Sequence, residues 1–148
     1  MAKLNIEATT GDVSINSDRG KLQFVGGNKG ALSGNLVINA AGDITTADGT
    51  VLNGNRINFT SLGAINAAIA PGQTLTSSDT MSASVNANAY GDITLTNSNG
   101  DMRIGHIASQ TGNVNLTTSG SFIDAVGDST LSDSEGKLQK WQELGLIN

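Results

Sequence analysis

Residues 91–107 read GDITLTNSNGDMRIGHI, and residues 112–125 read GNVNLTTSGSFIDA. Both stretches repeat one short unit: a glycine, usually an aspartate or asparagine, and then apolar and polar residues in alternation. An alternation with a period of two residues is typical of a β-strand that has one buried face. The glycine and its aspartate or asparagine neighbour are typical of a tight corner between strands, because both tolerate a left-handed backbone.

The same unit recurs along most of the chain. Well-formed copies begin at Gly11, Gly20, Gly34, Gly42, Gly54, Gly63, Gly91, Gly100, Gly112 and Gly120. Two weaker copies, at residues 72–75 and 83–87, lie in the longest gap between them. Alternate copies are about 20 residues apart, a period that would place equivalent side chains above one another after each lap of the backbone. This period favours an all-β fold, a right-handed parallel β-helix of about five to six rungs. A meander of hairpins stays open, since Asn53-Gly54 and Asn99-Gly100 suit tight reversals.

The alternation also predicts which side chains form the core. Each inward side chain should lie on its counterpart one rung away, about 4.8 Å along the axis. The residues expected to point inward are Val13, Ile15, Leu36, Ile38, Ile57, Phe59, Ile93, Leu95, Val114 and Leu116. The residues expected to point outward are Ser14, Asn58, Thr94, Arg103 and Asn115. Two strong strands fall in each period, and the pattern allows either two or three strands per rung.

The composition argues against several classes of protein. A net charge of −5 with only 8 Lys and Arg disfavours a nucleic-acid partner. The lack of cysteine removes disulfide scaffolds, thiolate zinc sites and cysteine nucleophiles. No apolar run approaches the roughly 20 residues of a membrane-spanning helix. Ile, Val and Leu recur throughout the chain, so an ordered fold is expected despite the many small polar residues.

The last part of the chain has a different composition. Ser132 and Glu135 match a helix capping box, and apolar residues follow at helical spacing. This pattern predicts a short amphipathic α-helix over residues 133–144. The sequence therefore predicts two parts of the chain. Residues 1–127 form a parallel β-helix, and residues 128–148 form a loop and helix that cap the solenoid or are inserted beside it.

The aspartates of the Gly-Asp pairs should lie at equivalent corners: Asp12, Asp43, Asp92 and Asp101. Stacked carboxylates could bind Ca²⁺, which prefers six to eight oxygen ligands. The calcium-binding Gly-Gly-x-Gly-x-Asp pattern is absent, and asparagine or lysine replaces aspartate at several corners. We therefore favour the interpretation that each aspartate is a turn residue that hydrogen-bonds its own backbone.

A catalytic role is the less favoured hypothesis. Polysaccharide lyases and glycosidases also use parallel β-helices, and hydrolysis needs two carboxylates about 5–9 Å apart. Asp92 and Asp101 lie near Arg103 in sequence, but no aromatic residues accompany them to bind sugars. His106, the only histidine, is expected to be a surface or corner residue. The prediction is a non-catalytic protein without a metal or cofactor.

Two features remain as candidate recognition or modification sites. Residues 68–83 are longer than the neighbouring corners, and a loop on a rigid scaffold often carries binding function. The candidate recognition residues in that stretch are Pro71, Ser77, Ser78 and Asp79. Asn58-Phe59-Thr60 and Asn115-Leu116-Thr117 match the glycosylation sequon, so Asn58 and Asn115 are candidate glycosylation sites.

The units quoted above resemble those of filamentous-haemagglutinin-like exoproteins, the large adhesins that Gram-negative bacteria secrete by the two-partner route. The closer likeness is to leukotoxin-like filamentous adhesins, whose stalks mix such rungs with short helical inserts, and GKLQKWQELGLI at residues 136–147 looks like one of them. The family's secretion motif, Asn-Pro-Asn-Gly, is absent, which fits a stalk fragment. The resemblance implies a parallel β-helix, export through an outer-membrane pore, and a secreted or cell-surface location.

The resemblance also implies a stalk or adhesive role, with a host-cell surface protein or glycan as the partner. Two alternatives stay open beside it. One is a carbohydrate-active β-helix enzyme, either a polysaccharide lyase or a glycosidase. The other is a structural solenoid that associates with itself end to end.

Overall fold

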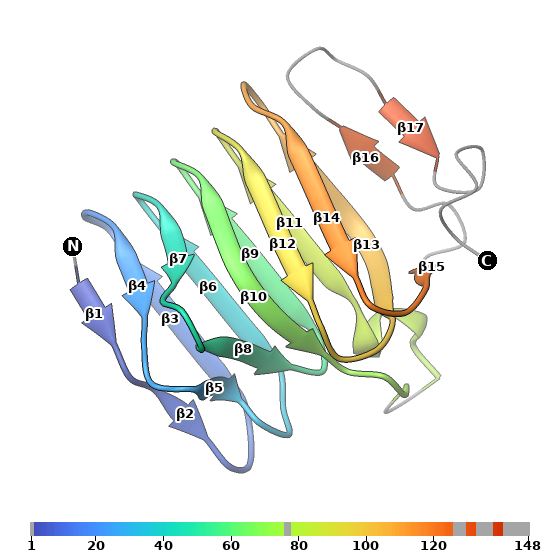
Figure 1. Ribbon diagram of the computed structural model, residues 1–148, viewed down its shortest axis with the longest axis horizontal. Coiled ribbons are helices and arrows are strands. Elements are labelled where there is room, and N and C mark those ends of the chain that lie inside the picture. Colours follow the sequence, from blue (N-terminus) through green and yellow to red (C-terminus); the bar gives the residue numbers. More distant parts are fainter. Residues whose placement is uncertain (1, 76–77, 126–129, 133–137, 141–148) are drawn as a thin grey trace.

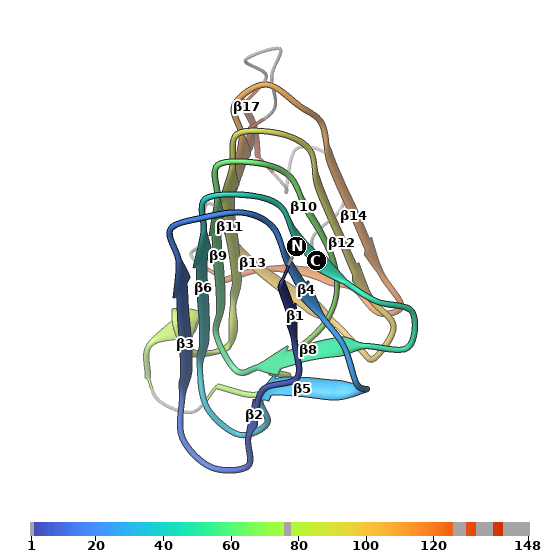
Figure 2. The ribbon, with the colours of Figure 1, turned by 90° about the vertical axis from the view of Figure 1, so that its left-hand side faces the viewer.

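The computed structural model describes residues 2–75, 78–125, 130–132 and 138–140. The chain is all-β, and its parallel strands stack as a solenoid of about six turns (Figure 1). Seen along the solenoid axis, the turns have a roughly triangular outline (Figure 2). The parallel β-helix predicted from the repeat is confirmed, and the meander of hairpins is wrong because consecutive turns pair in parallel.

The strands form three faces of the solenoid. Face 1 contains β3 (Val13–Ser17), β6 (Leu36–Ala40), β9 (Ile57–Ser61), β11 (Val85–Ala89), β13 (Met102–Ser109) and β16 (Thr130–Ser132), paired in that order. Face 2 contains β1 (Ala2–Leu4), β4 (Leu22–Phe24), β7 (Ile44–Thr46), the first part of β10 (Ile65–Pro71), β12 (Ile93–Asn97) and β14 (Val114–Thr118). Face 3 contains β2 (Glu7–Ala8), β5 (Asn28–Ala31), β8 (Val51–Gly54) and the end of β10. β15 (Phe122–Asp124) pairs with the first residues of β13.

A complete turn therefore has three strands, as in β6, β7 and β8. The two strong strands of each sequence period belong to faces 1 and 2. Face 3 was not evident from the sequence, because its strands are short and contain glycine or asparagine in place of a clear apolar alternation. Gly30 in β5 and Asn53 in β8 are neighbours in the ladder of that face.

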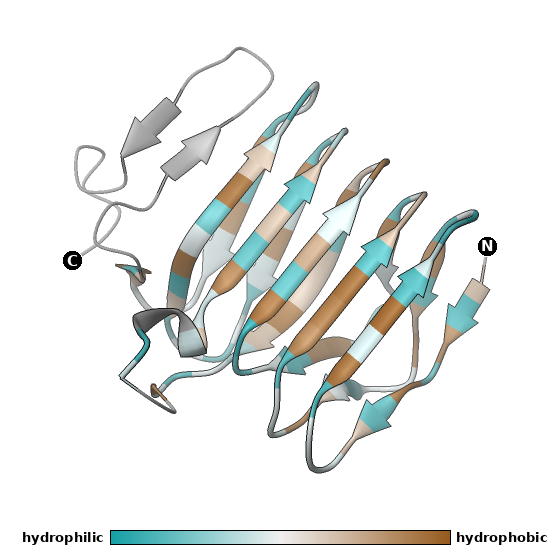
Figure 3. Cartoon of the chain, turned by 180° about the vertical axis from the view of Figure 1, so that it is seen from behind, coloured by the Kyte–Doolittle hydropathy of each residue, from teal (hydrophilic) through white to brown (hydrophobic). Residues whose placement is uncertain are grey.

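Like side chains stack in ladders inside the solenoid. On face 1, Val13 pairs with Leu36, Leu36 with Ile57, Ile57 with Val85, and Val85 with Ile104. All five side chains are buried. Figure 3 shows the alternation of hydrophobic and hydrophilic residues along the strands. Burial of one such aliphatic side chain contributes about 1.5–3 kcal/mol, so the ladder is a main source of stability.

The ten residues predicted to point inward all belong to the core or pack against it. Ile15, Val114 and Leu116 are half-buried, and the other seven are buried. Among the described strands, β3, which contains Ile15, and β14, which contains Val114 and Leu116, each have a partner on one side only.

The irregular middle of the sequence is an insertion between two regular turns. Ile57 pairs with Val85, 28 residues later, whereas Leu36 pairs with Ile57, 21 residues later. The extra residues follow β10 and include the 3₁₀-helix η1 (Thr80–Ala83). The weak copy at residues 83–87 leads into β11, a regular core strand of face 1.

The helix predicted over residues 133–144 is wrong where the structure describes that stretch. Leu138–Lys140 form a strand, β17, which pairs antiparallel with β16. β16 in turn pairs parallel with β13, so the sheet of face 1 continues past the boundary predicted at residue 127. The edge of β13 offers unpaired backbone groups, and strand pairing there satisfies them. Residues 133–137 and 141–144 of the predicted helix lie outside the described residues.

Candidate functional site

The four corner aspartates bind the backbone of the following turn. In each case the carboxylate Oδ1 accepts a hydrogen bond of 2.8 Å from a backbone N–H about one period later in the chain. The pairs are Asp12 with Asn35, Asp43 with Ala64, Asp92 with Asn113, and Asp101 with Ser121. The expectation that these aspartates hydrogen-bond their own turn is therefore corrected: the bond runs between turns.

The carboxylate completes the hydrogen-bond ladder where the chain bends. At the corner before β3, the N–H of Val13 donates to the carbonyl of Asn35, in the next turn, at 2.9 Å. The N–H of Asn35 then has the Asp12 carboxylate as its acceptor. Asn35 repeats the arrangement, since its own side-chain oxygen accepts a bond of 3.2 Å from the N–H of Arg56. An amide oxygen performs the same task as a carboxylate, so either asparagine or aspartate can serve at a corner.

Three of the glycines that precede a corner residue make room for the aspartate of the preceding turn. A Cβ atom added to Gly63, Gly112 or Gly120 would overlap the Oδ1 atom of Asp43, Asp92 or Asp101, respectively. Gly91 follows a turn that has Ala64 at this corner, and a Cβ atom there would meet its nearest neighbour at an ordinary 3.4 Å. None of these glycines has a positive φ. A left-handed backbone, the expected reason for corner glycines, does apply to Gly11 and Gly100, which precede Asp12 and Asp101.

Replacement of Asp92 tests the bond between turns. Asp92→Asn is expected to change the free energy of unfolding by less than about 0.5 kcal/mol, because an amide oxygen can still accept from Asn113. Asp92→Ala is expected to lower it by about 1 kcal/mol, since that N–H loses its acceptor. Urea unfolding of the three proteins measures the difference. A calcium site would give another result: Asn and Ala would be equally damaging, and added Ca²⁺ would stabilise only the unmodified protein.

The residues of the enzyme hypothesis lie at separate corners. Asp92 precedes β12 and Asp101 follows it, so the two carboxylates are at opposite ends of one strand. Both are engaged with backbone N–H groups of the next turn. Arg103 is half-buried between the buried residues Met102 and Ile104 of β13.

Within the described ranges, no three His, Cys, Asp or Glu side chains come close enough together to hold a metal ion. No helix in the described part of the chain has the length and apolar character needed to span a lipid bilayer.

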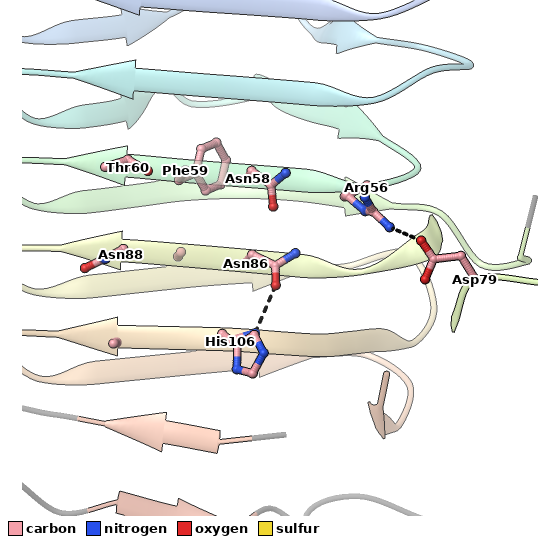
Figure 4. Close-up of a pocket in the computed structure, with 10 residues that line it drawn as sticks. Arg56, Asn58, Phe59, Thr60, Asp79, Asn86, Asn88 and His106 are labelled. Carbon is pink, nitrogen blue, oxygen red and sulfur yellow. Dashed lines mark hydrogen bonds and ion pairs between the residues drawn. The ribbon is translucent and has the colours of Figure 1, made fainter. Parts of the chain in front are cut away.

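A groove of about 570 Å³ crosses the outer surface of face 1 (Figure 4). It runs over β9, β11 and β13, at right angles to the strands. The polar side chains that line it are Arg56, Asn58, Thr60, Asp79, Asn86, Asn88 and His106, and Phe59, Ala87 and Ala108 complete it. We call this site the polar groove.

The inserted segment supplies one end of the polar groove. Asp79 Oδ2 lies 2.8 Å from Arg56 Nη2, and this ion pair is seen at the groove's edge in Figure 4. Of the other predicted recognition residues, Pro71 is buried at the end of β10, and Ser78 is exposed. Ser77 lies outside the described residues. Of the three described residues, Asp79 alone lines the polar groove.

His106 reaches the polar groove through an irregularity in the sheet. The register between β11 and β13 shifts, because Val85 pairs with Ile104 but Ala87 pairs with Ile107. Two residues of β13 thus face Asn86, and the Asn86 side-chain oxygen accepts a 3.0 Å bond from the N–H of His106 (Figure 4). The His106 side chain is exposed, as expected for a surface histidine.

The candidate glycosylation sites both lie on strands with their side chains outward. Asn58 is half-buried in β9 and lines the polar groove, whereas Asn115 is exposed in β14 on face 2. Modification of either amide stays a prediction.

The sequence interpretation missed Asn86 and Asn88 as site residues. They occupy the same two outward positions of β11 as Asn58 and Thr60 do in β9. That shared position was the available signal, and the long insertion before β11 obscured it.

Comparisons of the chain with models of protein families, with curated proteins and with solved structures gave no match.

Proposed function

We propose that this chain is a non-catalytic segment of a large secreted or surface-displayed bacterial protein, in which it serves as a stiff stalk with an adhesive surface. The resemblance of its repeats to filamentous-haemagglutinin-like exoproteins motivates the assignment of the parent protein. Export of that parent through an outer-membrane pore, and contact with a host-cell surface protein or glycan, belong to the same proposal. So does end-to-end contact between copies.

The observation that carries the proposal is the pairing of successive turns on faces 1 and 2, and on face 3 as far as the end of β10. The ladder of Val13, Leu36, Ile57, Val85 and Ile104 gives each turn the same buried neighbours above and below. In such a solenoid each repeat contacts only its neighbours, so length grows with the number of turns while the cross-section stays constant. A constant cross-section with additive length is what a spacer requires.

The corner carboxylates also favour a structural role over a catalytic one. Asp92 and Asp101 each accept a backbone hydrogen bond from the next turn at 2.8 Å. A glycosidase needs two carboxylates that face a common substrate, about 5–9 Å apart. Side chains committed to separate corners support the stalk proposal over the carbohydrate-active enzyme.

Removal of one turn tests whether length is modular. Deletion of residues 93–113 joins Asp92 to Val114, which pairs with Ile93 in the intact protein. The shortened chain is expected to unfold cooperatively and to be shorter by about 4.8 Å, the spacing of neighbouring strands. The chain has no cysteine, so Asn16→Cys and Thr117→Cys provide two specific dye positions for a resonance energy transfer measurement. Loss of cooperative unfolding in the deletion variant would contradict the spacer proposal.

The intact protein should also release no product from pectin, alginate or chondroitin sulfate. Reducing ends or unsaturated sugars that appear with the protein, and disappear with Asp92→Asn and Asp101→Asn, would replace the stalk by the carbohydrate-active enzyme. Circular dichroism of both variants verifies that they keep the β fold.

A further inference from the structure

Three side chains of the polar groove have hydrogen-bonding groups without a partner among the residues that the structure describes. Across the described residues, no protein group bonds the side-chain amides of Asn58 and Asn88 or the hydroxyl of Thr60. Each amide offers two donors and an oxygen acceptor, and the hydroxyl offers both functions. The polar groove therefore has unused donors and acceptors in close alternation.

The spacing of these groups is set by the sheet and is thus rigid. Asn58 pairs with Asn86, and Thr60 pairs with Asn88, on neighbouring strands about 4.8 Å apart. Asn86 is held in place, because its nitrogen donates to Ser84 Oγ at 3.1 Å while its oxygen accepts from His106. From β9 to β13 the polar groove spans two strand spacings, or about 10 Å. A ligand would meet a preformed surface, which lowers the entropic cost of binding.

The charge of the polar groove favours an uncharged ligand. Among its described lining residues Arg56 is the only Lys or Arg, and it is paired with Asp79 at 2.8 Å. An anionic ligand would have to compete with that carboxylate, and the protein as a whole carries a net charge of −5. Neutral molecules that carry many neighbouring hydroxyl groups match the alternating donors and acceptors of asparagine and threonine.

We propose that the polar groove binds a neutral saccharide, one or two sugar rings long, through Asn58, Asn86 and Asn88. Asn58 and Asn88 supply the free amides, Asn86 and His106 form the central wall, and the Arg56–Asp79 pair closes one end. This inference deepens the adhesive role proposed above, on which it rests, by naming the surface and the class of ligand. It makes Asn58 a binding residue, so a glycan attached there would block the site.

Titration of the ¹⁵N-labelled protein with lactose, maltose and cellobiose tests the proposal. At least one sugar is expected to shift the side-chain amide resonances of Asn58, Asn86 and Asn88. Asn58→Ala and Asn88→Ala should each weaken binding by about fivefold, the effect of one hydrogen bond. Both side chains lack an internal partner, so the remaining spectrum should be unchanged.

Matched controls come from face 2. Asn115→Ala and Thr117→Ala remove the same kinds of exposed side chain from β14 and should leave sugar binding unchanged. Three results would overturn the saccharide proposal: no shift with any of the sugars at tens of millimolar, equal binding by the Asn58→Ala and Asn88→Ala variants, or binding of N-acetylneuraminic acid in place of the neutral sugars. Each of these leaves the spacer proposal standing, because that proposal is tested by the deletion of one turn.

Discussion

Replacement of Gly63 by alanine is expected to lower the free energy of unfolding by about 3 kcal/mol, the upper range for overpacking in a rigid interior. Replacement of Gly91, at the same corner one turn later, should change it by less than about 1 kcal/mol. The two glycines are a matched pair, since both precede a corner residue and neither has a positive φ. They differ in the preceding turn, which has Asp43 below Gly63 but Ala64 below Gly91.

The penalty at Gly63 should depend on Asp43. The added Cβ atom would overlap Asp43 Oδ1, while its next neighbours, the backbone N of Asp43 and C of Gly42, lie at 3.0 and 3.2 Å. Asp43→Ala alone should lower stability by about 1 kcal/mol, because the N–H of Ala64 loses its acceptor. In the Asp43→Ala background, Gly63→Ala should then cost less than about 1 kcal/mol.

Equilibrium urea unfolding of the four proteins in this double-mutant cycle measures the coupling between the two positions. A coupling energy of about 2 kcal/mol is expected. Additive effects, or an equal loss at Gly63 and Gly91, would mean that glycine is needed at these corners for a reason other than the carboxylate of the preceding turn.

Phe59→Ala is expected to have the largest effect of any single truncation in the core, about 3–5 kcal/mol. Phe59 is 2% exposed and lies between Ile38 of the preceding turn and Ala87 of the following one. The small Ala87 side chain leaves space for the ring. Because the strands above and below are fixed by backbone ladders, the solenoid has little freedom to collapse into the cavity.

Phe122→Ala is the control for this prediction. Phe122 is half-buried in β15, near the end of the described solenoid, and its loss should cost about 1–2 kcal/mol. Thermal and urea unfolding, followed by far-ultraviolet circular dichroism, measure both variants. An equal loss for the two phenylalanines would show that burial along the solenoid does not set the stability of a turn.

The strands of faces 1 and 2 could be predicted because each carries its own alternation of apolar and polar residues. Alternation marks the inward residues, and the period places Val13 beside Leu36 and Ile93 beside Val114. Face 3 was not predictable, because glycine and asparagine at positions such as Gly30 and Asn53 leave no alternation to detect. The strand at Leu138–Lys140 was missed because its partner, β16, was itself unrecognised, and a helix pattern can satisfy the same apolar spacing.

The polar groove is formed by contacts that depart from the regular repeat of the sequence. Asn58 and Asn86 are neighbours in the sheet but 28 residues apart in sequence, well over the usual period. His106 faces the same surface only because the register shifts between β11 and β13. The ion pair of Arg56 with Asp79 needs the inserted segment to fold back over the sheet. None of these three features leaves a periodic signal.

The pairing of a corner carboxylate with the glycine one turn ahead has a consequence for how such rods lengthen. A tandem duplication of the DNA that encodes one turn copies the corner aspartate together with the glycine that makes room for the aspartate of the preceding turn. The one new junction, between the two copies, is then compatible without any compensating substitution. Arrays of this kind can grow or shrink by recombination in steps of one turn, whereas a side chain in place of a glycine such as Gly63 must be matched by a change of the aspartate about 20 codons away.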